Sequence, residues 1–208
     1  MGKGCLVSEH WIQTFTDKAF DFLEIKSSVI CIQDIAHALA YQCRYNGHCR
    51  QFYSVAEHSV RASVLLENKN YTTDIVAAAL LHDAHEAYLG DVVAPLKTLA
   101  AINEGFQNLA DAIDAAIGEH FLIPPHLFKH FGVVWADHTL LATELRDLFG
   151  DLARNFSVPG VTALDTKIVP VSPDQAEALF LERFKAVFSS RSHELLVRWG
   201  LGEKVSGK

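Results

Sequence analysis

Apolar residues recur at helical spacing along most of the chain, and this pattern predicts an all-α fold. A first helix is expected over 34–42, with Asp34 as its N-terminal cap. The next stretch, 44–51, contains the turn-forming pair Asn46-Gly47 and is therefore expected to be a loop.

Two further helices are predicted from stronger local signals. Ser54, followed three residues later by Glu57, is typical of a capping box and predicts a helix that starts at Ser54. Another helix is expected over 73–89, with Gly90 as its stop. Its segment 75–81 is apolar on every side, so we expect this helix to be the central, buried one of the bundle.

The remainder of the chain continues the helical pattern with one irregular part. Residues 90–97 are expected to form a loop, and helices should follow near 100–120 and 125–149. The Val-, Thr- and Pro-containing stretch 158–171 predicts an irregular segment or a short hairpin. Ser172-Pro173-Asp174-Gln175 then opens a last helix, with Ser as cap and Pro at the first helical position.

No repeat or long linker interrupts the sequence, so we expect a single domain over residues 1–208. Half of the 208 residues are hydrophobic, which allows a large buried core. None of the four cysteines belongs to a C-x-x-C pair, so a zinc ribbon is not expected. Cys43 and Cys49 could meet in space, but we interpret all four, including Cys5 and Cys31, as free thiols.

The net charge of −7 argues against a protein that coats nucleic acid through a broad basic surface. It leaves room for a small anionic substrate, because a bound cation and a few basic residues can reverse the potential inside one pocket. No signal peptide is recognisable, and no apolar run nears the roughly 20 residues of a membrane span. We therefore expect a soluble, cytoplasmic protein without a nucleic acid polymer or a membrane as partner.

The central helix carries an unusual cluster of ionisable residues directly after its apolar segment: His82, Asp83, His85 and Glu86. Burying an unpaired carboxylate is costly, and proteins pair such groups or give them a metal ion. The adjacent residues His82 and Asp83 cannot close a metal site alone, so further ligands must come from other helices.

His58 and Asp137 are the best candidates for these further ligands. Taken alone, a histidine on an apolar helix is more often an ordinary core residue, and an aspartate near a helix start is usually a cap. The cluster on the central helix has no such structural purpose and shifts the interpretation toward a cation. Farther along the chain, Trp135 is expected in the core, and Glu144 and Arg146 in surface or interhelical pairs.

The order His58, His82-Asp83, Asp137 resembles the HD-domain superfamily of phosphohydrolases. A longer string is similar to its smaller deoxynucleotidase branch, which includes bacterial 5′-deoxyribonucleotidases and phage dATP triphosphohydrolases. That string comprises residues 44–48, 53–58, 81–83, 86–91 and 95–97. The resemblance covers a motif-bearing core at about 34–150, whereas 151–208 is a C-terminal extension with an irregular segment and a helix.

The resemblance implies an HD-domain helical bundle that binds one divalent ion through His58, His82, Asp83 and Asp137. Mixed nitrogen and oxygen ligands suit Mn, Co, Fe, Ni or Zn, with Mg as the alternative for a triphosphate substrate. Such a metal lowers the pKa of its bound water and polarises a phosphoryl oxygen.

The resemblance also implies a catalytic carboxylate at Glu86 and a supporting one at Asp91. Glu86 lies one turn beyond His82, close enough to orient or deprotonate the water. The alternative for Glu86 is a role as partner of His85. Asp91 could bind a substrate hydroxyl, capture a leaving-group proton or merely cap the turn.

Phosphate groups need cationic donors, and the resemblance ranks Arg44 and Lys97 first as substrate-binding residues. His48, Arg50 and His85 are further candidates, and a solvated surface charge is the alternative, favoured for Arg50. Tyr45 stands where the monophosphatase members carry a Trp, which leaves the contacts to base and sugar open.

We therefore expect a deoxynucleotide phosphohydrolase in which metal-activated water attacks the α-phosphorus of a mono- or triphosphate. One alternative is hydrolysis of a signalling nucleotide such as (p)ppGpp or a cyclic dinucleotide. Another is a non-catalytic, HD-like binding module, which would predict the loss of a ligand or of the acid. Family members of this size are commonly dimers or larger assemblies, so a homodimer or larger homo-oligomer is expected.

Overall fold

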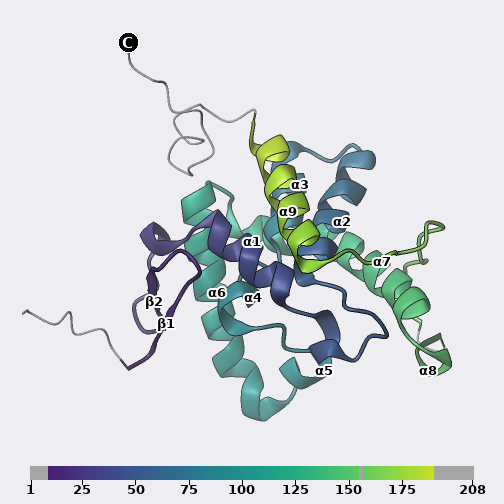
Figure 1. The fold of residues 1–208 in the computed structure, drawn as a ribbon, viewed down its shortest axis with the longest axis horizontal. Coiled ribbons are helices and arrows are strands. Elements are labelled where there is room, and N and C mark those ends of the chain that lie inside the picture. The colour runs from purple at the N-terminus through teal and green to yellow at the C-terminus, as the bar shows by residue number, and fades with distance from the viewer. Residues whose placement is uncertain (1–8, 155–156, 190–208) are drawn as a thin grey trace, which may run out of the picture.

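The structure is a computed structural model that describes residues 9–154 and 157–189, and it is mostly helical (Figure 1). The helices are α1 (Ile32–Tyr41), α2 (Val55–Asn68), α3 (Thr73–Leu81), α4 (Glu86–Leu89), α5 (Ala94–Lys97), α6 (Ala100–Phe121), α7 (Phe131–Leu148), α8 (Asp151–Arg154) and α9 (Pro173–Phe188). Short 3-10 helices are η1 (Ser27–Val29), η2 (Arg44–Gly47) and η3 (Pro125–Lys129). The predicted all-α class is confirmed at this level, and no helix among these is long and apolar enough to cross a membrane.

A small β-hairpin, not predicted from the sequence pattern, precedes the helices. Strands β1 (Trp11–Gln13) and β2 (Ala19–Asp21) pair antiparallel, with Trp11 opposite Asp21. The turn between them is fixed to α1, because the Asp34 carboxylate accepts hydrogen bonds from Thr16 N at 2.6 Å and Thr16 Oγ1 at 2.9 Å. The prediction of Asp34 as a cap is therefore wrong: α1 begins at Ile32, and Cys31 occupies the cap position.

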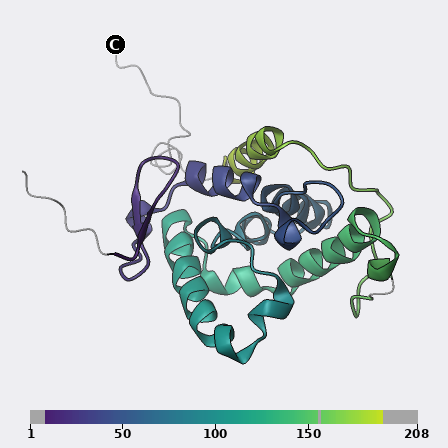
Figure 2. The ribbon, with the colours of Figure 1, turned by 60° about the horizontal axis from the view of Figure 1, so that its bottom comes forward.

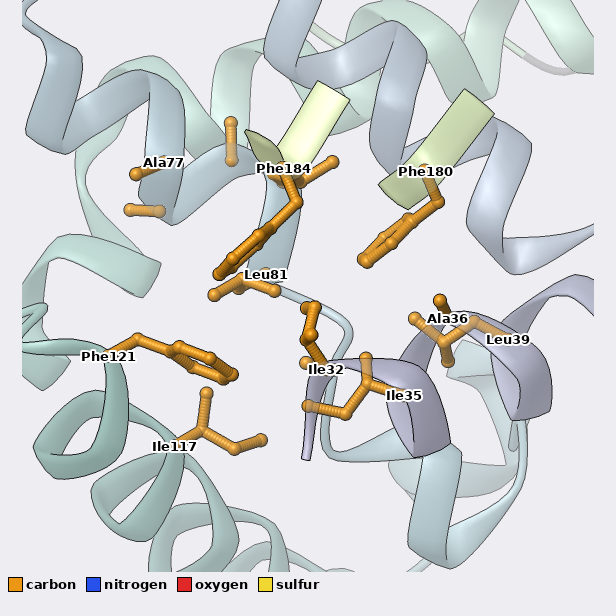
Figure 3. Close-up of a cluster of buried hydrophobic side chains, with 14 of the residues drawn as sticks. Ile32, Ile35, Ala36, Leu39, Ala77, Leu81, Ile117, Phe121, Phe180 and Phe184 are labelled. Atoms are coloured by element: carbon orange, nitrogen blue, oxygen red, sulfur yellow. The ribbon is translucent and has the colours of Figure 1, made fainter. Parts of the chain in front are cut away.

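Helix α3 is the central helix of the fold, as its apolar sequence predicts. Every residue from Val76 to Leu81 is buried. Figure 3 shows the side chains of α1, α3, α6 and α9 that meet in the core around it. In Figure 2, α9 lies at the top, above α1 and α2, whereas α6 and α7 lie below.

The C-terminal helix α9 completes this core although it lies outside the region of family resemblance. Phe180, Phe184 and Phe188 are fully buried, and the Phe184 ring contacts that of Phe121 on α6 at a centroid distance of 5.2 Å. Burying one such side chain contributes roughly 1.5–3 kcal/mol. The segment after residue 150 thus supplies part of the hydrophobic core.

The two predicted capping boxes have different outcomes. At the start of α9 the box is complete, with reciprocal bonds between Ser172 and Gln175. At the start of α2, Ser54 Oγ accepts from Glu57 N at 3.0 Å, but the Glu57 carboxylate does not return to the cap. It accepts the amide of Val171 at 3.0 Å and thereby ties the irregular segment before α9 to α2.

The helix predicted over 73–89 is interrupted at the ionisable cluster. Residues 82–85 form tight turns with hydrogen bonds between residues three apart, such as Glu86 N to Asp83 O at 3.0 Å. His82 Nδ1 lies 2.8 Å from the carbonyl oxygen of Ala79, which the amide of Asp83 would take in a regular helix. The side chain thus competes with the helix backbone at this point. Gly90, with φ of 81°, ends α4 as predicted.

Three other segment predictions are refined by the structure. Helix α6 confirms the helix near 100–120, and the loop predicted over 90–97 ends in the short helix α5. The helix predicted over 125–149 is split at His130, whose Nδ1 accepts from Gly132 N and caps α7. The segment 158–171 contains no strand, so the irregular alternative holds over the hairpin.

Candidate metal centre and adjoining pocket

Ligand atoms from three helical segments converge beside the buried end of α3. His58 from α2, His82 after α3 and Asp137 from α7 each offer one ligand atom, and these atoms lie within 4.8 Å of one another. Nε2 of His58 lies 3.2 Å from Oδ1 of Asp137. This cluster can hold a metal ion.

Asp83, the fourth predicted ligand, faces the same point. Its Oδ2 lies 3.2 Å from His82 Nε2 and 3.8 Å from His58 Nε2. The tight turn over residues 82–85 brings this carboxylate and the neighbouring imidazole to one side. The structure therefore brings all four predicted ligands together.

The hydrogen bonds of the two imidazoles show that this donor set fits a metal ion. His58 Nδ1 donates to Glu144 Oε1 at 2.7 Å and His82 Nδ1 donates to the Ala79 carbonyl, because a carboxylate or carbonyl oxygen can only accept. Both Nε2 atoms are buried, and each lies 3.2 Å from a carboxylate oxygen, that of Asp137 or of Asp83, without the geometry of a hydrogen bond. Such orphaned polar atoms are costly, and two of them facing two carboxylates match the ligand preference of a divalent transition metal.

Electrostatics in the cluster favour the charged forms of its acids and imidazoles. Burial and the Arg44 guanidinium lower the pKa of His58, but the carboxylates of Glu144 and Asp137 outweigh them and raise it to about 9. Burial raises the pKa of Asp83, yet the adjacent His82 imidazole outweighs it and holds this pKa well below its usual range. A cation bound here would displace protons from the imidazoles.

Glu86 lies next to the cluster and is 3 % exposed. Its Oε1 accepts from Lys97 Nζ at 2.9 Å, and its Oε2 is buried without a hydrogen-bond partner. Burial and the charge of Asp83 raise the pKa of Glu86 to about 7, although Lys97 opposes them. A carboxyl group with this pKa can both take up and release a proton near neutral pH.

A pocket of about 430 Å³ opens beside the cluster, within the size range of small-molecule sites. One part of its wall is charged and consists of Arg44, Asp83, Glu86, Asp91, Lys97 and Asp137. The other part is mainly apolar and includes Val92, Val93, Pro95, Leu141 and Leu145. The pocket therefore offers polar and apolar surfaces to one ligand.

The predicted cationic residues divide into two groups. Arg44 and Lys97 line the pocket, and Arg44 is only 9 % exposed, so it is no solvated surface charge. His48 and Arg50 are exposed and lie outside the pocket wall. His85 also lies outside it and pairs through Nδ1 with Asp114 on α6 at 3.0 Å. The partner of Glu86 is therefore Lys97 rather than His85.

Comparison with known proteins places the chain in a family. No family model matches the sequence. The chain is 38 % identical over 176 residues to the uncharacterized protein YfdR of Escherichia coli strain K12, a match that covers 84 % of this chain and 93 % of that protein. The chain belongs to the YfdR family. It is also 39 % identical over 118 residues to an uncharacterized protein of Rhodobacter capsulatus, covering 55 % of this chain and 59 % of that protein.

The loop before α2 closes one side of the pocket in this YfdR-family protein. Tyr45, Asn46 and Gly47 have positive φ values, which are rare for a tyrosine. Tyr45 N donates to Asp91 Oδ2 at 3.0 Å, so Asp91 caps this turn while it also lines the pocket. The free thiols of Cys43 and Cys49 flank the loop, with their sulfur atoms 3.6 Å apart. Cys31 is also a free thiol, and Cys5 lies outside the described residues.

Glu144 is a functional candidate in this YfdR-family protein that the sequence pattern alone does not single out. It is fully buried on α7 and pairs with His58 of α2, so the interhelical alternative of its prediction holds over the surface one, and it also contacts Arg44 and Tyr45. Burial raises its pKa, but Arg44 and His58 outweigh burial and lower it to about 2. The available signal was its spacing: position 144 is seven residues after Asp137, on the same face of the helix.

Proposed function

We propose that the protein is a metal-dependent phosphohydrolase of the HD-domain type that acts on deoxynucleoside monophosphates. One observation carries the proposal: the two orphaned Nε2 atoms of His58 and His82 face two carboxylates at the wall of a pocket. The same wall supplies Glu86 as an acid–base group and Arg44 and Lys97 as cations. A structural metal site would need none of these three.

The proposed ligands of the ion are His58, His82, Asp83 and Asp137. A divalent ion at this position lowers the pKa of a bound water and polarises a phosphoryl oxygen. The protein's own contribution is the fixed direction of the imidazoles, whose Nδ1 atoms are held by Glu144 and by the Ala79 carbonyl. This ligand set favours a transition metal such as Mn, Co, Fe, Ni or Zn.

Glu86 would remove the proton from the attacking water. Its Oε2 is buried and has no hydrogen-bond partner among the described residues, and its pKa of about 7 leaves it partly ionised at neutral pH. Glu86 lines the same pocket as the proposed ligands Asp83 and Asp137, where a substrate and the attacking water would meet. This arrangement supports Glu86 as the general base.

Arg44 and Lys97 would bind the phosphoryl oxygens. A guanidinium has five N–H donors, and the contacts of Arg44 to Glu144 and Asp83 use only two of its nitrogen atoms. Lys97 has three donors, one of which lies on Glu86. Among the described residues that line the pocket, these are the two cations, and His48, Arg50 and His85 lie outside. This number of donors favours one phosphate over three.

The apolar part of the wall supports a deoxynucleoside as the remainder of the substrate. Val92, Val93 and Leu141 can contact the faces of a base and a deoxyribose. A ribose would place its 2′-hydroxyl against such a surface, where an unpaired polar group costs about 1–3 kcal/mol. The lack of polar side chains there also predicts weak discrimination among bases.

The test is a screen of all dNMPs, NMPs, dNTPs and NTPs with Mn, Co and Mg, in which the released phosphate species is identified. We expect orthophosphate from dNMPs with a transition metal, and little release from NMPs. The Glu86→Gln protein serves as the matched control for contaminating phosphatases. Release of triphosphate from dNTPs would reassign the substrate, and no release from any nucleotide by metal-loaded protein would contradict a nucleotide phosphohydrolase.

A further inference from the structure

The two carboxylate oxygens of Glu144 serve two different parts of the site. Oε1 accepts from Nδ1 of His58 at 2.7 Å. Oε2 accepts from Nε of Arg44 at 3.2 Å and from the hydroxyl of Tyr45. One oxygen therefore faces the metal centre and the other faces the loop that carries the proposed phosphate-binding arginine.

This arrangement is more than a buried ion pair. A buried ion pair is weak support for stability, because the desolvation of both charges offsets their attraction. Here three donors from two segments distant in sequence converge on one side chain of α7 that is 0 % exposed. Each histidine or arginine donor uses only part of its hydrogen-bonding capacity on Glu144 and has another nitrogen directed to the site.

The neighbourhood of Tyr45 shows what the second oxygen of Glu144 holds in place. The backbone of Tyr45 has φ of 59°, and its amide and its hydroxyl are both held, by Asp91 and by Glu144. The guanidinium of Arg44 lies 5.2 Å from the Tyr45 ring. The orientation of Arg44 thus depends on the same oxygen that anchors the loop.

We propose that Glu144 is a positioning residue that couples the metal centre to the substrate loop. Through Oε1 it keeps the proton of His58 on Nδ1 and the Nε2 atom directed at the ion. Through Oε2 it holds Arg44 and Tyr45 in the geometry that receives a phosphoryl group. The inference rests on the proposed function for the identity of the two ligands.

A glutamine at this position separates a positioning role from a merely structural one. Glu144→Gln has nearly the same shape but only one carbonyl oxygen, so it can serve His58 or the Arg44–Tyr45 side, not both. Tyr45→Phe removes only one donor to Oε2 and leaves the contact with His58. Glu57→Gln is the matched control, because Glu57 is likewise a buried glutamate, at 3 % exposed, and binds Arg61 and the Val171 amide instead.

Two affinities are measured on the full chain: Zn²⁺ binding by competition with a chromogenic chelator, and inorganic phosphate binding to the metal-loaded protein by calorimetry. We expect Glu144→Gln to weaken at least one of them by about 10–100-fold, the usual effect of losing such a partner of a metal ligand. Tyr45→Phe should leave the Zn²⁺ affinity within about twofold and weaken phosphate binding several-fold. Glu57→Gln should change neither beyond about twofold.

The ¹⁵N shifts of the His58 ring give a readout that a structural role would not move. The metal-free form is the informative one, because an ion on Nε2 would by itself leave the proton on Nδ1. Above about pH 9, the neutral His58 ring should carry its proton on Nδ1 in the wild-type and Tyr45→Phe proteins, and this preference should weaken in Glu144→Gln. Wild-type values of both affinities in Glu144→Gln, or equal losses in Glu57→Gln, would overturn the proposal. If Glu144→Gln does not fold, the Tyr45→Phe protein provides the test. An unchanged phosphate affinity in that variant would contradict the proposal.

Neither affinity depends on nucleotide turnover. If the protein hydrolyses no nucleotide but its variants show the expected changes in affinity, the proposed function is wrong and the coupling role of Glu144 stands. A wild-type protein that binds neither Zn²⁺ nor phosphate would overturn both.

Discussion

Lys97 Nζ lies 2.9 Å from Oε1 of Glu86, so the proposed phosphate-binding cation and the proposed general base form one ion pair in the pocket wall. The pair lies on α5 and at the start of α4, two short helices separated by the loop that follows Gly90. Glu86 is almost fully buried, whereas the Lys97 side chain is 30 % exposed. An incoming phosphate would compete with Glu86 for the ammonium group and leave the carboxylate free to act on water.

Replacing Glu86 by Gln should separate catalysis from metal binding. The substitution removes the ionisable group but none of the four proposed ligands. We expect stoichiometric metal and a kcat that is about 10²–10⁴-fold lower, the usual contribution of general acid–base catalysis. Elemental analysis and steady-state kinetics on the best dNMP measure the two quantities. A kcat near that of the wild type would remove Glu86 from the mechanism.

The pH dependence of kcat/KM should report the Glu86–Lys97 pair. A base must be ionised to act, so activity is expected to rise with pH along an acidic limb at or below about 7, because Glu86 has a pKa of about 7 in the metal-free protein and a bound cation would lower it. Lys97 lowers this pKa, and Lys97→Met should therefore move the acidic limb to higher pH, whatever it does to the absolute rate. A limb that stays in place or moves to lower pH would show that Glu86 does not produce it.

Metal affinity should increase with pH because His58 must lose a proton to bind. With a pKa of about 9 in the metal-free protein, His58 is protonated at pH 7. Competition by this proton weakens as the pH rises, so affinity should grow by at least about tenfold per pH unit and level off above about pH 9. A proton on His82, whose pKa is also raised, adds to this slope. Chelator competition at pH 6.5, 7.5 and 8.5 measures this slope, with His82→Ala as the control that should lose the site. A flat profile would argue against His58 as a ligand.

The proposed metal ligands could be selected from the sequence because their burial was readable there. The apolar run over 75–81 places His82 and Asp83 at the end of a buried helix, where ionisable groups need a charged partner or a metal ion. His58 and Asp137 required the additional resemblance of their order along the chain. The structure then brings ligand atoms of His58, His82 and Asp137 within 4.8 Å of one another and places Asp83 beside both imidazoles.

Features that depend on tertiary contacts could not be predicted in the same way. Glu144 looks like any helical glutamate until its distance to His58, 86 residues away, is known. The break after Leu81 arises because the His82 ring takes the Ala79 carbonyl, a choice that helix periodicity does not encode. The strands of the N-terminal hairpin are three residues long, too short to show a periodic pattern.

The role of α9 in the core leads to a prediction about stability. Phe184 is fully buried, stacks on Phe188 at 4.1 Å and contacts Phe121 at 5.2 Å. Phe184→Ala should therefore lower the free energy of unfolding by about 3–5 kcal/mol, through lost burial and the cavity that remains.

Leu179→Ala on the same helix is the matched control. Leu179 is 41 % exposed, so its truncation removes little buried surface and should lower the free energy of unfolding by less than about 1 kcal/mol. Urea unfolding of the metal-free proteins measures both changes without a contribution from bound ligand. If Phe184→Ala cost no more than Leu179→Ala, α9 would be an appendage to the bundle. A large difference between them would instead show that the segment after residue 150 helps to hold α1 and α3 in place. It would then also help to hold the end of α3, where His82 and Asp83 meet the other proposed ligands.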